Sequence, residues 1–442
     1  MAYLLMNSEG MWGSNKSYQP QLEMLGRKEI ESLQNKKLVA AFEKAKNVPF
    51  LRKKIQESGL KDFEGLEDLE KVPFTTKKDL VDCFPYGASA VPISEIVRVH
   101  TSTGTTAKPI ASLYTRADLA TWSELMARTL ACAGVHKGDI FQVAASQGIH
   151  AGSSGYFAGA ELLGVNVIPY GKTDPLKQLE TMSEYHVTVF GSLPSFAVSM
   201  LDVLSEAGEE LKRSLKLRLA VMGAEPWTRE LRSKIEERFG IPVYNNYGLA
   251  EVGGPGVATE CPARQGLHVW EDHFVIEIIN PGTGERLGEG EEGELVITPL
   301  SREAMPILRY RTGDLTRILP GSCDCGRQHT MIDWTVGRIG DIIKVGGVGF
   351  YPSSVEKVIA SQKESSGNYQ IILSGIDEIT IRLEVATEFW QNRGVVNDLG
   401  EQIGEEIKDA TRLAAEVEIV PQGSLSRAEG KVKRVLDLRK PA

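Results

Sequence analysis

The sequence predicts an α/β protein. A large N-terminal domain combines parallel-sheet α/β layers with a small β-barrel-like part, and a small α+β domain follows. Between about residues 95 and 260, short apolar runs alternate with helical stretches, which is typical of parallel sheets covered by helices. After about residue 260, glycine-rich turns such as Asn280–Gly284 join strand-like runs and favour antiparallel strands. Beyond Arg338 a shorter α+β unit begins, so we expect domains at 1–338 and 339–442.

The spacing of apolar residues predicts the individual elements. Helices are expected where apolar residues recur every three or four positions, and strands where short apolar runs lie between turn residues. The expected helices are Leu22–Lys46, Phe50–Ser58, Ala117–Ala133, Gly155–Leu163, Pro194–Ala207, Thr228–Phe239, Ser353–Ser361 and Val395–Thr411. The expected strands are Ile96–His100, Ile140–Ala145, Val165–Pro169, Val187–Phe190, Leu217–Met222, Pro242–Asn245, Phe274–Ile279, Gly293–Thr298, Leu315–Ile318, Ile342–Val345, Tyr369–Ser374, Ile379–Val385 and Ala415–Val420.

Composition and charge exclude several function classes. The 442 residues are 42% hydrophobic and 25% charged, which is ordinary for a globular protein. The net charge of −9, without a basic stripe, argues against nucleic-acid binding. No stretch approaches 18 apolar residues, and the N-terminus lacks a basic start followed by an apolar run, so we expect neither a membrane span nor a signal peptide. Five cysteines at irregular spacing favour reduced thiols or a metal site, and we expect a cytoplasmic protein.

A loop rich in glycine and threonine, Thr101–Pro109, is suited to phosphate binding. Gly104 lets the backbone approach an anion closely. Its spacing does not match the G-x-x-x-x-G-K-[ST] phosphate loop, and a polar surface turn is the alternative. Donors to phosphate oxygens are supplied by Ser102, Thr103, Thr105, Thr106 and Lys108.

Together with five motifs that follow in order, this loop resembles the T-S-G-T-T-G-K-P signature of the adenylate-forming superfamily. The later motifs are Gly223–Thr228, Asn246–Glu251, Tyr310–Asp314, Gly337–Arg338 and Glu429–Lys431. The G-A-E-P-W-T wording of the first, and the runs Gly254–Cys261 and Gly266–Phe274, resemble the phenylacetate–CoA ligase branch in particular. The resemblance covers roughly residues 35–437, and Ala107 stands where the signature has its second glycine.

The resemblance implies an enzyme that activates a carboxylic acid with ATP, giving acyl-AMP and pyrophosphate, and then transfers the acyl group to coenzyme A. The resemblance places Glu251 at the Mg²⁺ position, and a carboxylate there suits a hard cation, which prefers oxygen ligands. Asp314 matches the carboxylate that holds the ribose hydroxyls. The implied ATP- and AMP-binding residues are Ser102, Thr103, Gly104, Thr105, Thr106, Lys108, Gly223, Ala224, Glu225, Asn245, Asn246, Tyr247, Gly248, Asp314 and Arg338.

Each of these roles has a plainer alternative. Glu251 can be a solvated loop residue, and Asp314 can serve an Asx-turn after Gly313. Arg338 can form a surface salt bridge. Tyr247, which the resemblance places against adenine, can be an ordinary core tyrosine.

The resemblance implies that the small C-terminal α+β domain is mobile, and this domain carries the residues implied for the remaining steps. Lys431 matches the mobile lysine that bridges the α-phosphate and the acyl carboxylate, with Lys433 as a competitor. Gly346 and Gly347 match the close approach of the backbone to the pantetheine arm of coenzyme A. The hinge position that usually carries Asp or Lys is Gly340 here, which still permits a domain rotation.

Three cysteines and a histidine predict a structural zinc site. Cys261, His268, Cys323 and Cys325 make a tetrahedral ligand set, and the resemblance raises this expectation because some members of the branch carry zinc at such positions. His273 and His329 are substitute ligands, and buried thiols beside a satisfied histidine are the alternative. Four protein ligands leave no open position, so a catalytic zinc is not expected.

The acyl pocket departs from the branch pattern. Where its members show an aromatic-rich run, this chain has Ala145, Gln147, Gly148 and His150, and Asn246 stands where an isoleucine is common. A buried polar group without a partner costs about 1–3 kcal/mol. We therefore expect a hydroxy- or amino-substituted aryl acid, unless these groups bond only to protein or water.

Two other function classes stay open. An adenylating ligase can deliver the acyl group to an amine, a hydroxyl or a carrier thiol, as in natural-product pathways. The chain could instead be a nucleotide-binding protein without catalytic activity. The presence of both Lys431 and Glu251 argues against this alternative. The resemblance also implies a homodimer.

Overall fold

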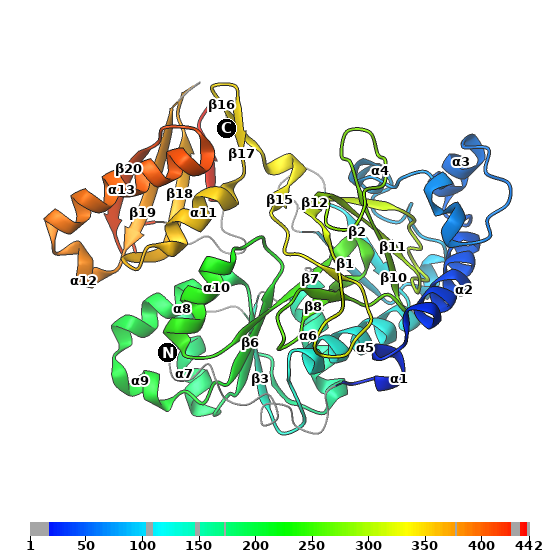
Figure 1. Ribbon diagram of the computed structural model, residues 1–442. Coiled ribbons are helices and arrows are strands. Elements are labelled where there is room, and N and C mark those ends of the chain that lie inside the picture. Colours follow the sequence, from blue (N-terminus) through cyan, green and yellow to red (C-terminus); the bar gives the residue numbers. More distant parts are fainter. Residues whose placement is uncertain are drawn as a thin grey trace. The chain divides into compact units, whose positions relative to one another are not determined.

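The structure, a computed structural model, describes residues 17–102, 109–145, 151–171, 174–375, 378–425 and 434–439, without the side chains of 393–395. The chain divides into two compact units, which are described one at a time (Figure 1). The first unit spans Met1–Lys172, Val189–Gly191 and Tyr244–Trp334, and the second spans Thr173–Thr188, Ser192–Val243 and Thr335–Ala442.

The first unit joins helices to parallel and antiparallel strands. Its helices are α1 (Pro20–Glu23), α2 (Arg27–Ala45), α3 (Pro49–Glu57), α4 (Lys77–Asp82), α5 (Arg116–Cys132) and α6 (Ala151–Leu163). Its strands are β1 (Arg98–Thr101), β2 (Ala111–Tyr114), β3 (Ile140–Ala144), β4 (Asn166–Ile168), β5 (Val189–Ser192), β7 (Val243–Leu249), β8 (Gly254–Glu260), β9 (Leu267–Val269), β10 (Phe274–Ile279), β11 (Gly293–Pro299), β12 (Tyr310–Thr316), β13 (Ile318–Leu319) and β14 (Met331–Ile332).

Pairing between these strands is antiparallel at one end and parallel at the other. Strands β10, β11 and β12 form an antiparallel meander, and β7, β8, β9, β14 and β13 pair antiparallel in that order. Strand β3 pairs in parallel with β4. Helix α2 lies beside the meander (Figure 1), where Leu38 and Phe42 pack in one apolar cluster with Val275 of β10.

Local sequence signals account for the helix ends. Helix α5 begins at a capping box, in which the Asp118 N–H donates to Thr115 Oγ1 at 3.1 Å and the Thr115 N–H donates to Asp118 Oδ2 at 3.0 Å. In the second unit, helix α10 (Arg229–Phe239) begins after Thr228, whose hydroxyl accepts from the Leu231 N–H. It ends at Gly240, which has a φ of 71° that glycine adopts at low cost.

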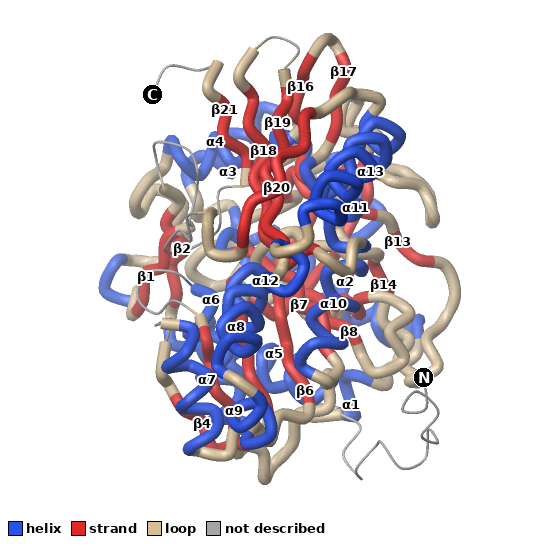
Figure 2. Tube along the Cα trace, turned by 90° about the vertical axis from the view of Figure 1, so that its left-hand side faces the viewer, coloured by secondary structure: helices blue, strands red, loops and turns tan. Residues whose placement is uncertain are grey.

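The second unit carries helices on a mixed sheet. Its helices are α7 (Pro175–Glu184), α8 (Pro194–Ala207), α9 (Glu209–Ser214), α10, α11 (Pro352–Ser361), α12 (Thr387–Trp390) and α13 (Arg393–Thr411). Its strands are β6 (Leu219–Gly223), β15 (Gly337–Arg338), β16 (Ile343–Val345), β17 (Val348–Phe350), β18 (Ser365–Leu373), β19 (Ile379–Val385), β20 (Glu416–Pro421) and β21 (Val435–Asp437). Figure 2 shows β18–β21 side by side next to α11 and α13.

Pairing in the sheet β20-β19-β18-β21 is antiparallel between β18 and β19 and parallel at both edges. Apolar side chains of α11 and α13, including Val355 and Ile403, pack with Ile371 and Leu383 of the central strands in one buried cluster. This α+β arrangement over residues 343–437 is the one that the sequence predicts for the end of the chain.

The predicted fold class is confirmed, with corrections to single elements. Helix α8 has the predicted bounds, α10 and α11 begin one residue away from the predicted start, and α5 is shifted by one residue at both ends. The predicted strand Leu315–Ile318 is wrong, because β12 covers Tyr310–Thr316 and β13 is separate. Its polar T-G-D sequence hides the alternation by which strands are recognised. Strands β2, β8, β9, β14, β15, β17 and β21 were not predicted.

None of the helices within the described ranges has the length and apolar composition that crossing a membrane requires. The domain boundary between residues 338 and 339 stays a prediction.

Candidate active site

Residues of two separate motifs meet in the first unit. Tyr247 lies on β7 and Asp314 on β12, and the Tyr247 hydroxyl donates to Asp314 Oδ2 at 2.7 Å. Asp314 is only 3% exposed, and its N–H donates to Thr312 Oγ1 across a turn where Gly313 has a φ of 75°. Although 67 positions separate them, the residue expected against adenine and the residue expected at the ribose are therefore neighbours.

Glu251 lies in the 3₁₀ turn Ala250–Val252, where β7 ends. The Ser112 hydroxyl donates to the Ala250 carbonyl oxygen at 2.7 Å and so holds this turn. Strands β7 and β8 approach closely beside it, since a Cβ on Gly248 would lie 2.4 Å from the Gly254 carbonyl oxygen, where no side chain fits. Glu251 itself is half-buried. A fixed backbone with solvent access suits a carboxylate that binds a partly hydrated cation.

The buried Asn246 has partners within the protein. Its Nδ2 donates to the Tyr156 hydroxyl at 3.2 Å, and its Oδ1 accepts from the Gly256 N–H at 3.2 Å. Burial raises the pKa of Tyr156 to about 12, and the Asn246 bond opposes this. Because both ends of the amide are engaged, Asn246 does not call for a polar substituent on the substrate. Asn246 therefore no longer supports the prediction of a hydroxy- or amino-substituted acid.

Asn245 lies on β7 and Ala145 directly follows β3, and both residues are buried. The Asn245 N–H donates to Glu260 Oε2 at 2.9 Å, and the indole Nε1 of Trp334 donates to Glu260 Oε1 at 2.9 Å. Glu260 therefore fixes the backbone just before Tyr247. Neither Glu260 nor Tyr156 was singled out from the sequence, because a buried polar residue within an apolar run has no local signature.

The motif residue Gly223 is the last residue of β6 in the second unit, and Ala224 and Glu225 follow it. Ala224 has a φ of 70°, which is strained for a residue with a Cβ. The Glu225 carboxylate accepts from the Ser195 N–H, and its Oε2 accepts from the Ser195 hydroxyl at 3.0 Å. A carboxylate is favourable at a helix N-terminus, and Ser195 lies in the first turn of α8. In the sequence, the Pro194–Ser195 pair marks this helix start, and it is the feature from which a partner for the Glu225 carboxylate could have been predicted.

The structure also places four candidate residues near the C-terminal end of the chain. Arg338 is half-buried on β15. Gly346 and Gly347 form the tip of the β16–β17 hairpin with φ values of 55° and 80°, so the turn itself explains both glycines. A Cβ added to Gly340 would meet no heavy atom within 4 Å, and the φ of Gly340 is not in the left-handed region. Packing therefore does not require glycine at the expected hinge.

Several predicted site residues lie outside the described part of the chain. Ser102, at the edge of one gap, is described, and its N–H donates to the Ile110 carbonyl oxygen at 3.0 Å while its Oγ accepts from the Ile110 N–H at 3.3 Å. These two hydrogen bonds join β1 to β2 where the candidate phosphate-binding loop, Thr101–Pro109, begins and ends. The predicted residues outside the described ranges are Thr103, Gly104, Thr105, Thr106, Lys108, Gln147, Gly148, His150 and Lys431.

The predicted zinc ligands do come together. The Sγ atoms of Cys261, Cys323 and Cys325 and a ring nitrogen of His268 all lie within 4.8 Å of one another. Cys261 Sγ is 3.5 Å from Cys323 Sγ, and Cys325 Sγ is 3.3 Å from His268 Nε2. Three thiols and one imidazole at such distances suit tetrahedral zinc, and all four side chains are at least half-buried.

The charges of this cluster also fit a cation. Contact with the thiols of Cys261 and Cys323, and with His268, holds the pKa of Cys325 well below its usual range. Burial lowers the pKa of His268, but the sulfur atoms of Cys323 and Cys325 outweigh it and raise the pKa to about 9. A site that stabilises a thiolate beside a positive charge is one in which a bound Zn²⁺ would replace the proton.

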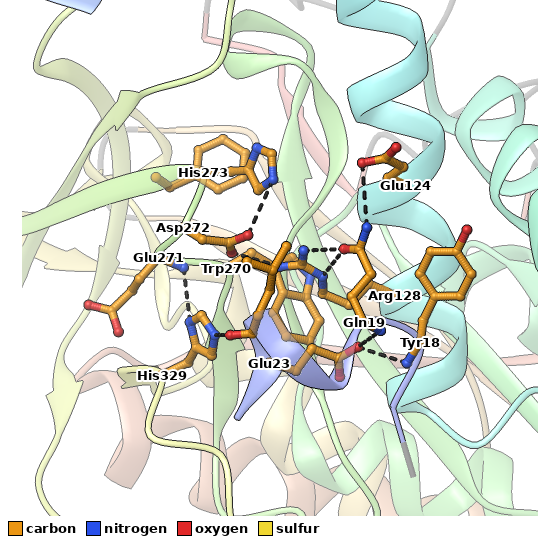
Figure 3. A network of polar contacts seen from close by, with 12 residues as sticks. Tyr18, Gln19, Glu23, Glu124, Arg128, Trp270, Glu271, Asp272, His273 and His329 are labelled. Carbon is orange, nitrogen blue, oxygen red and sulfur yellow. Dashed lines mark hydrogen bonds and ion pairs between the residues drawn. The ribbon is translucent and has the colours of Figure 1, made fainter. Parts of the chain in front are cut away.

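A buried polar network ties the N-terminal segment to the rest of the first unit (Figure 3). Arg128 Nη1 on α5 donates to Asp272 Oδ1 at 2.6 Å, and its Nε donates to Gln19 Oε1 at 3.1 Å. Glu23 Oε2 accepts from Arg327 Nε at 3.1 Å, and neither Arg–carboxylate pair is exposed. Removing one partner of such a pair costs about 3–5 kcal/mol. Sequence analysis missed this network, because its members are distant along the chain.

The two substitute zinc ligands belong to this network instead. His329 Nδ1 accepts from the Glu271 N–H at 3.1 Å, and its Nε2 lies 3.1 Å from the Leu22 carbonyl oxygen. His273 Nε2 lies 3.3 Å from Asp272 Oδ2 (Figure 3). Neither histidine is in the metal-binding group that the described residues form, so the set with His268 is the one that the geometry supports.

His273 predicts a pH dependence of stability. Burial, reinforced by Lys37 and Arg128 and opposed by Asp272, lowers the pKa of His273 to about 3. An unfolded histidine has a pKa of about 6.5, so below that pH the unfolded state binds more protons than the folded state. Stability is therefore expected to fall as the pH drops from about 6.5, by at most about 1.4 kcal/mol per pH unit from this group.

Scanning calorimetry between pH 7 and pH 5 measures this effect. His273→Gln is expected to flatten the decline of Tm relative to the unaltered protein, because glutamine does not titrate. His136→Gln, at an exposed histidine, is the matched control and should leave the slope unchanged. An equal slope in His273→Gln and the unaltered protein would contradict the assignment.

Comparison with known proteins agrees with this geometry. The family model described as "AMP-binding enzyme" matches residues 31–299, and the model of the AMP-binding enzyme C-terminal domain matches residues 347–439. The chain is 41% identical to the phenylacetate–coenzyme A ligase of Thermus thermophilus, over 96% of this chain and 100% of that protein. It is 38% identical to the Escherichia coli phenylacetate–coenzyme A ligase, over 93% of this chain and 95% of that protein.

Solved structures give the same result. The 2-hydroxyisobutyryl-CoA ligase in complex with an acyl-AMP superposes with a TM-score of 0.90 at 26% identity, covering 98% of this chain and 95% of that chain. An anthranilate CoA ligase superposes with a TM-score of 0.59 at 17% identity, over 77% of this chain and 66% of that chain, and shares the fold. The chain therefore belongs to the AMP-binding enzyme family, in the branch of AMP-forming acid–CoA ligases that the phenylacetate–coenzyme A ligases represent.

Proposed function

We propose that this enzyme activates an aromatic carboxylic acid with ATP and transfers the acyl group to coenzyme A. The observation that carries the proposal is the hydrogen bond between Tyr247 and Asp314. It lies in the same unit as the Glu251 turn and supports grouping the residues proposed for adenine, ribose and Mg²⁺. Relatives named phenylacetate–coenzyme A ligase, similar over nearly the whole chain, support both the acid and the acceptor.

The chain's own groups would divide the work of adenylation. Adjacent ribose hydroxyls suit the two oxygens of Asp314, and Tyr247 orients that carboxylate. Glu251 would hold Mg²⁺, which neutralises phosphate charge when bound. Lys431 would place a compact positive charge between the α-phosphate and the acyl carboxylate. Ser102, Thr103, Thr105, Thr106 and Lys108 would donate to the phosphate oxygens.

Transfer to coenzyme A would use the C-terminal residues. We propose that residues 339–442 act as a domain that rotates about Gly340 between the two steps, as the resemblance implies. Gly346 and Gly347, at an exposed hairpin tip, would let the backbone pass close to the pantetheine arm. A homodimer stays a prediction.

The acid remains proposed as a hydroxy- or amino-substituted aryl acid. Ala145 is small and buried where the branch has an aromatic residue, which supports a roomier pocket. Gln147 and His150 are the remaining polar pocket candidates, since Asn246 has its partners within the protein. The proposal therefore rests on Ala145, Gln147 and His150.

Acid-dependent pyrophosphate release over a panel of benzoates, anthranilates and arylacetates tests the substrate. We expect the preferred ring-substituted acid to exceed phenylacetate by about tenfold or more in kcat/KM, the effect of one well-placed polar contact of about 1.4 kcal/mol. His150→Phe should reduce that preference. A preference for unsubstituted phenylacetate would contradict the proposal, and chromatography with and without coenzyme A identifies the acceptor.

We also propose that Cys261, His268, Cys323 and Cys325 bind structural zinc. The close approach of four buried or half-buried ligand atoms supports it. The site has four protein ligands, so the metal would brace the antiparallel strands and take no part in the chemistry.

A further inference from the structure

The turn that carries Glu251 is tied to β2 at its first residue and borders a cavity on its other side. The Ser112 hydroxyl of β2 donates to the Ala250 carbonyl oxygen at 2.7 Å, and the Gly253 N–H donates to the same oxygen at 3.2 Å. Residues 252–255 line a cavity of about 350 Å³ that is partly open to solvent. Because packing does not hold the chain on the side of the cavity, the position of the turn depends on its few remaining contacts.

Arg302 lines the same cavity and reaches the far end of the turn. It is the third residue after β11 and is only 7% exposed. A Cβ built on Gly253 would lie 3.5 Å from Arg302 Nη1 and 3.6 Å from Arg302 Cδ. Gly253 has a φ of 125°, which residues with a side chain rarely adopt. The arginine side chain therefore lies directly against this glycine.

The guanidinium group of Arg302 is in turn attached to β2. Its Nη2 donates to the Leu113 carbonyl oxygen, and its central carbon lies 4.3 Å from the centroid of the Tyr114 ring. A guanidinium that is both hydrogen-bonded and stacked on an aromatic ring has little freedom to move. Strand β2 thus contacts both ends of the turn, Ala250 through Ser112 and Gly253 through Arg302.

Asp118 fixes the loop on which Arg302 lies. Asp118 Oδ1 accepts from the Glu303 N–H at 2.8 Å, and Oδ2 accepts from the Ala304 N–H at 3.0 Å. Arg302 Nε lies 3.9 Å from Asp118 Oδ1. Asp118 is only 2% exposed and also caps α5. The arginine is therefore held by α5 and β2, which are both independent of the turn that it contacts.

Packing alone does not account for an arginine at this position. Within the described part of the chain, its Nε and Nη1 atoms have no hydrogen-bond partner. Idle donors on a buried charged group cost free energy, which an apolar side chain would not. Burial raises the pKa of Tyr114, Arg302 opposes this and Glu251 adds to it, so the Glu251 carboxylate lies within electrostatic reach of the ring on which Arg302 stacks.

We propose that Arg302 is a positioning residue that, together with Ser112, holds the Glu251 turn against β2 and thereby sets the affinity of Glu251 for Mg²⁺. This inference rests on the proposed function, in which Glu251 binds Mg²⁺. The arginine acts through the backbone of the turn. Mg²⁺ requires nearly ideal octahedral geometry at 2.0–2.1 Å, so a small displacement of the carboxylate weakens binding.

Hydrogen–deuterium exchange of the nucleotide-free protein tests the contact without any ligand. Arg302→Met keeps the apolar stem and removes the charge and the donors. We expect the amides of residues 250–254 to exchange at least about tenfold faster in this variant, because a local opening of the turn becomes easier. The amides of β10, on another sheet of the same unit, should exchange at an unaltered rate.

The Mg²⁺ dependence of acid-dependent ATP–pyrophosphate exchange tests the consequence. Arg302→Met and Ser112→Ala should each raise the Mg²⁺ concentration for half-maximal exchange by about 10- to 100-fold, the cost of a misplacement of about 1 Å. At saturating Mg²⁺ both variants should come within about threefold of the unaltered protein. Arg302→Lys, which keeps the charge, should recover part of the effect. A simple loss of folded protein would lower the maximal rate and leave the half-maximal concentration unchanged.

Two further variants separate positioning from stability. Arg128→Met is the matched control, because it also removes a buried arginine from an ion pair on α5. It should lower the Tm and leave the Mg²⁺ requirement unchanged. In a Glu251→Gln background, Arg302→Met should raise the Mg²⁺ requirement no further, because residues that act as a unit are not additive.

Several outcomes would overturn the proposal. Unaltered amide exchange of the turn in Arg302→Met, or a loss of maximal rate with an unaltered Mg²⁺ requirement, would make Arg302 merely structural. If Arg302→Met does not fold, Arg302→Lys and Ser112→Ala carry the same comparisons. A Glu251→Gln variant with an unaltered Mg²⁺ requirement would instead refute the role of Glu251 in the proposed function, and amide exchange would still decide whether Arg302 holds the turn.

Discussion

Lys431→Ala is expected to lower acid-dependent ATP–pyrophosphate exchange by about 10²- to 10³-fold, the effect of removing one group that stabilises developing charge. The lysine would supply a point charge between the α-phosphate and the acyl carboxylate, and alanine supplies none. Exchange kinetics with the best acid of the panel measure the loss. The rate of thioester formation from a preformed acyl-adenylate should stay within about threefold, because that step no longer involves the attack on phosphorus.

The chain offers its own control for this experiment. Lys433 lies two residues further on and competes with Lys431 for the same role. Lys433→Ala should leave exchange within about twofold if the Glu429–Gly430–Lys431 spacing identifies the lysine correctly. A reversed result, with Lys433→Ala the inactive variant, would move the catalytic role to Lys433 and leave the proposed reaction intact.

Cys261→Ser is expected to release the metal and to destabilise the first unit. Cys261 is fully buried, and its sulfur lies 3.5 Å from that of Cys323, which is 62 residues further along the chain. A metal that joins such distant segments contributes its binding free energy to folding. We expect a Tm lower by at least about 5 °C and the loss of zinc, measured by scanning calorimetry and by elemental analysis of the purified protein.

Cys83→Ser is the matched control. Cys83 is a half-buried thiol outside the metal-binding group, so this change should keep both the zinc content and the Tm. Purified protein with no zinc, or a Cys261→Ser variant that retains a full equivalent, would contradict the site. Because the four protein ligands leave no position for substrate, exchange activity in the folded Cys261→Ser variant should persist at low temperature.

Local sequence was sufficient for most elements of the fold. Helix α8 has the predicted bounds, since Pro194 sets its first turn and Gly208 follows its last residue. The order of the motifs identifies the family for a related reason, because each motif is a short run whose residues act together. Where polar residues interrupt a strand, as at Thr312–Asp314 in β12, the alternation that reveals strands disappears.

For the candidate site, too, the sequence predicts some properties and not others. Their identities follow from the motifs, but their partners do not. The sequence suggests Tyr247 and Asp314 separately, yet the hydrogen bond between them joins β7 to β12. Asn246 looks like a group in need of a polar substrate, and only the structure supplies its partners Tyr156 and Gly256.

The sequence by itself determined the family, the fold class and the names of the nucleotide-binding and metal-binding candidates. Only the tertiary structure decided which of them meet. It brought together Arg128 and Asp272 across 144 positions, and it placed His268, and neither His273 nor His329, beside the three cysteines. The physical reason is that helix and strand propensities depend on neighbours along the chain, whereas these contacts depend on strand register and on where a buried charge finds its partner.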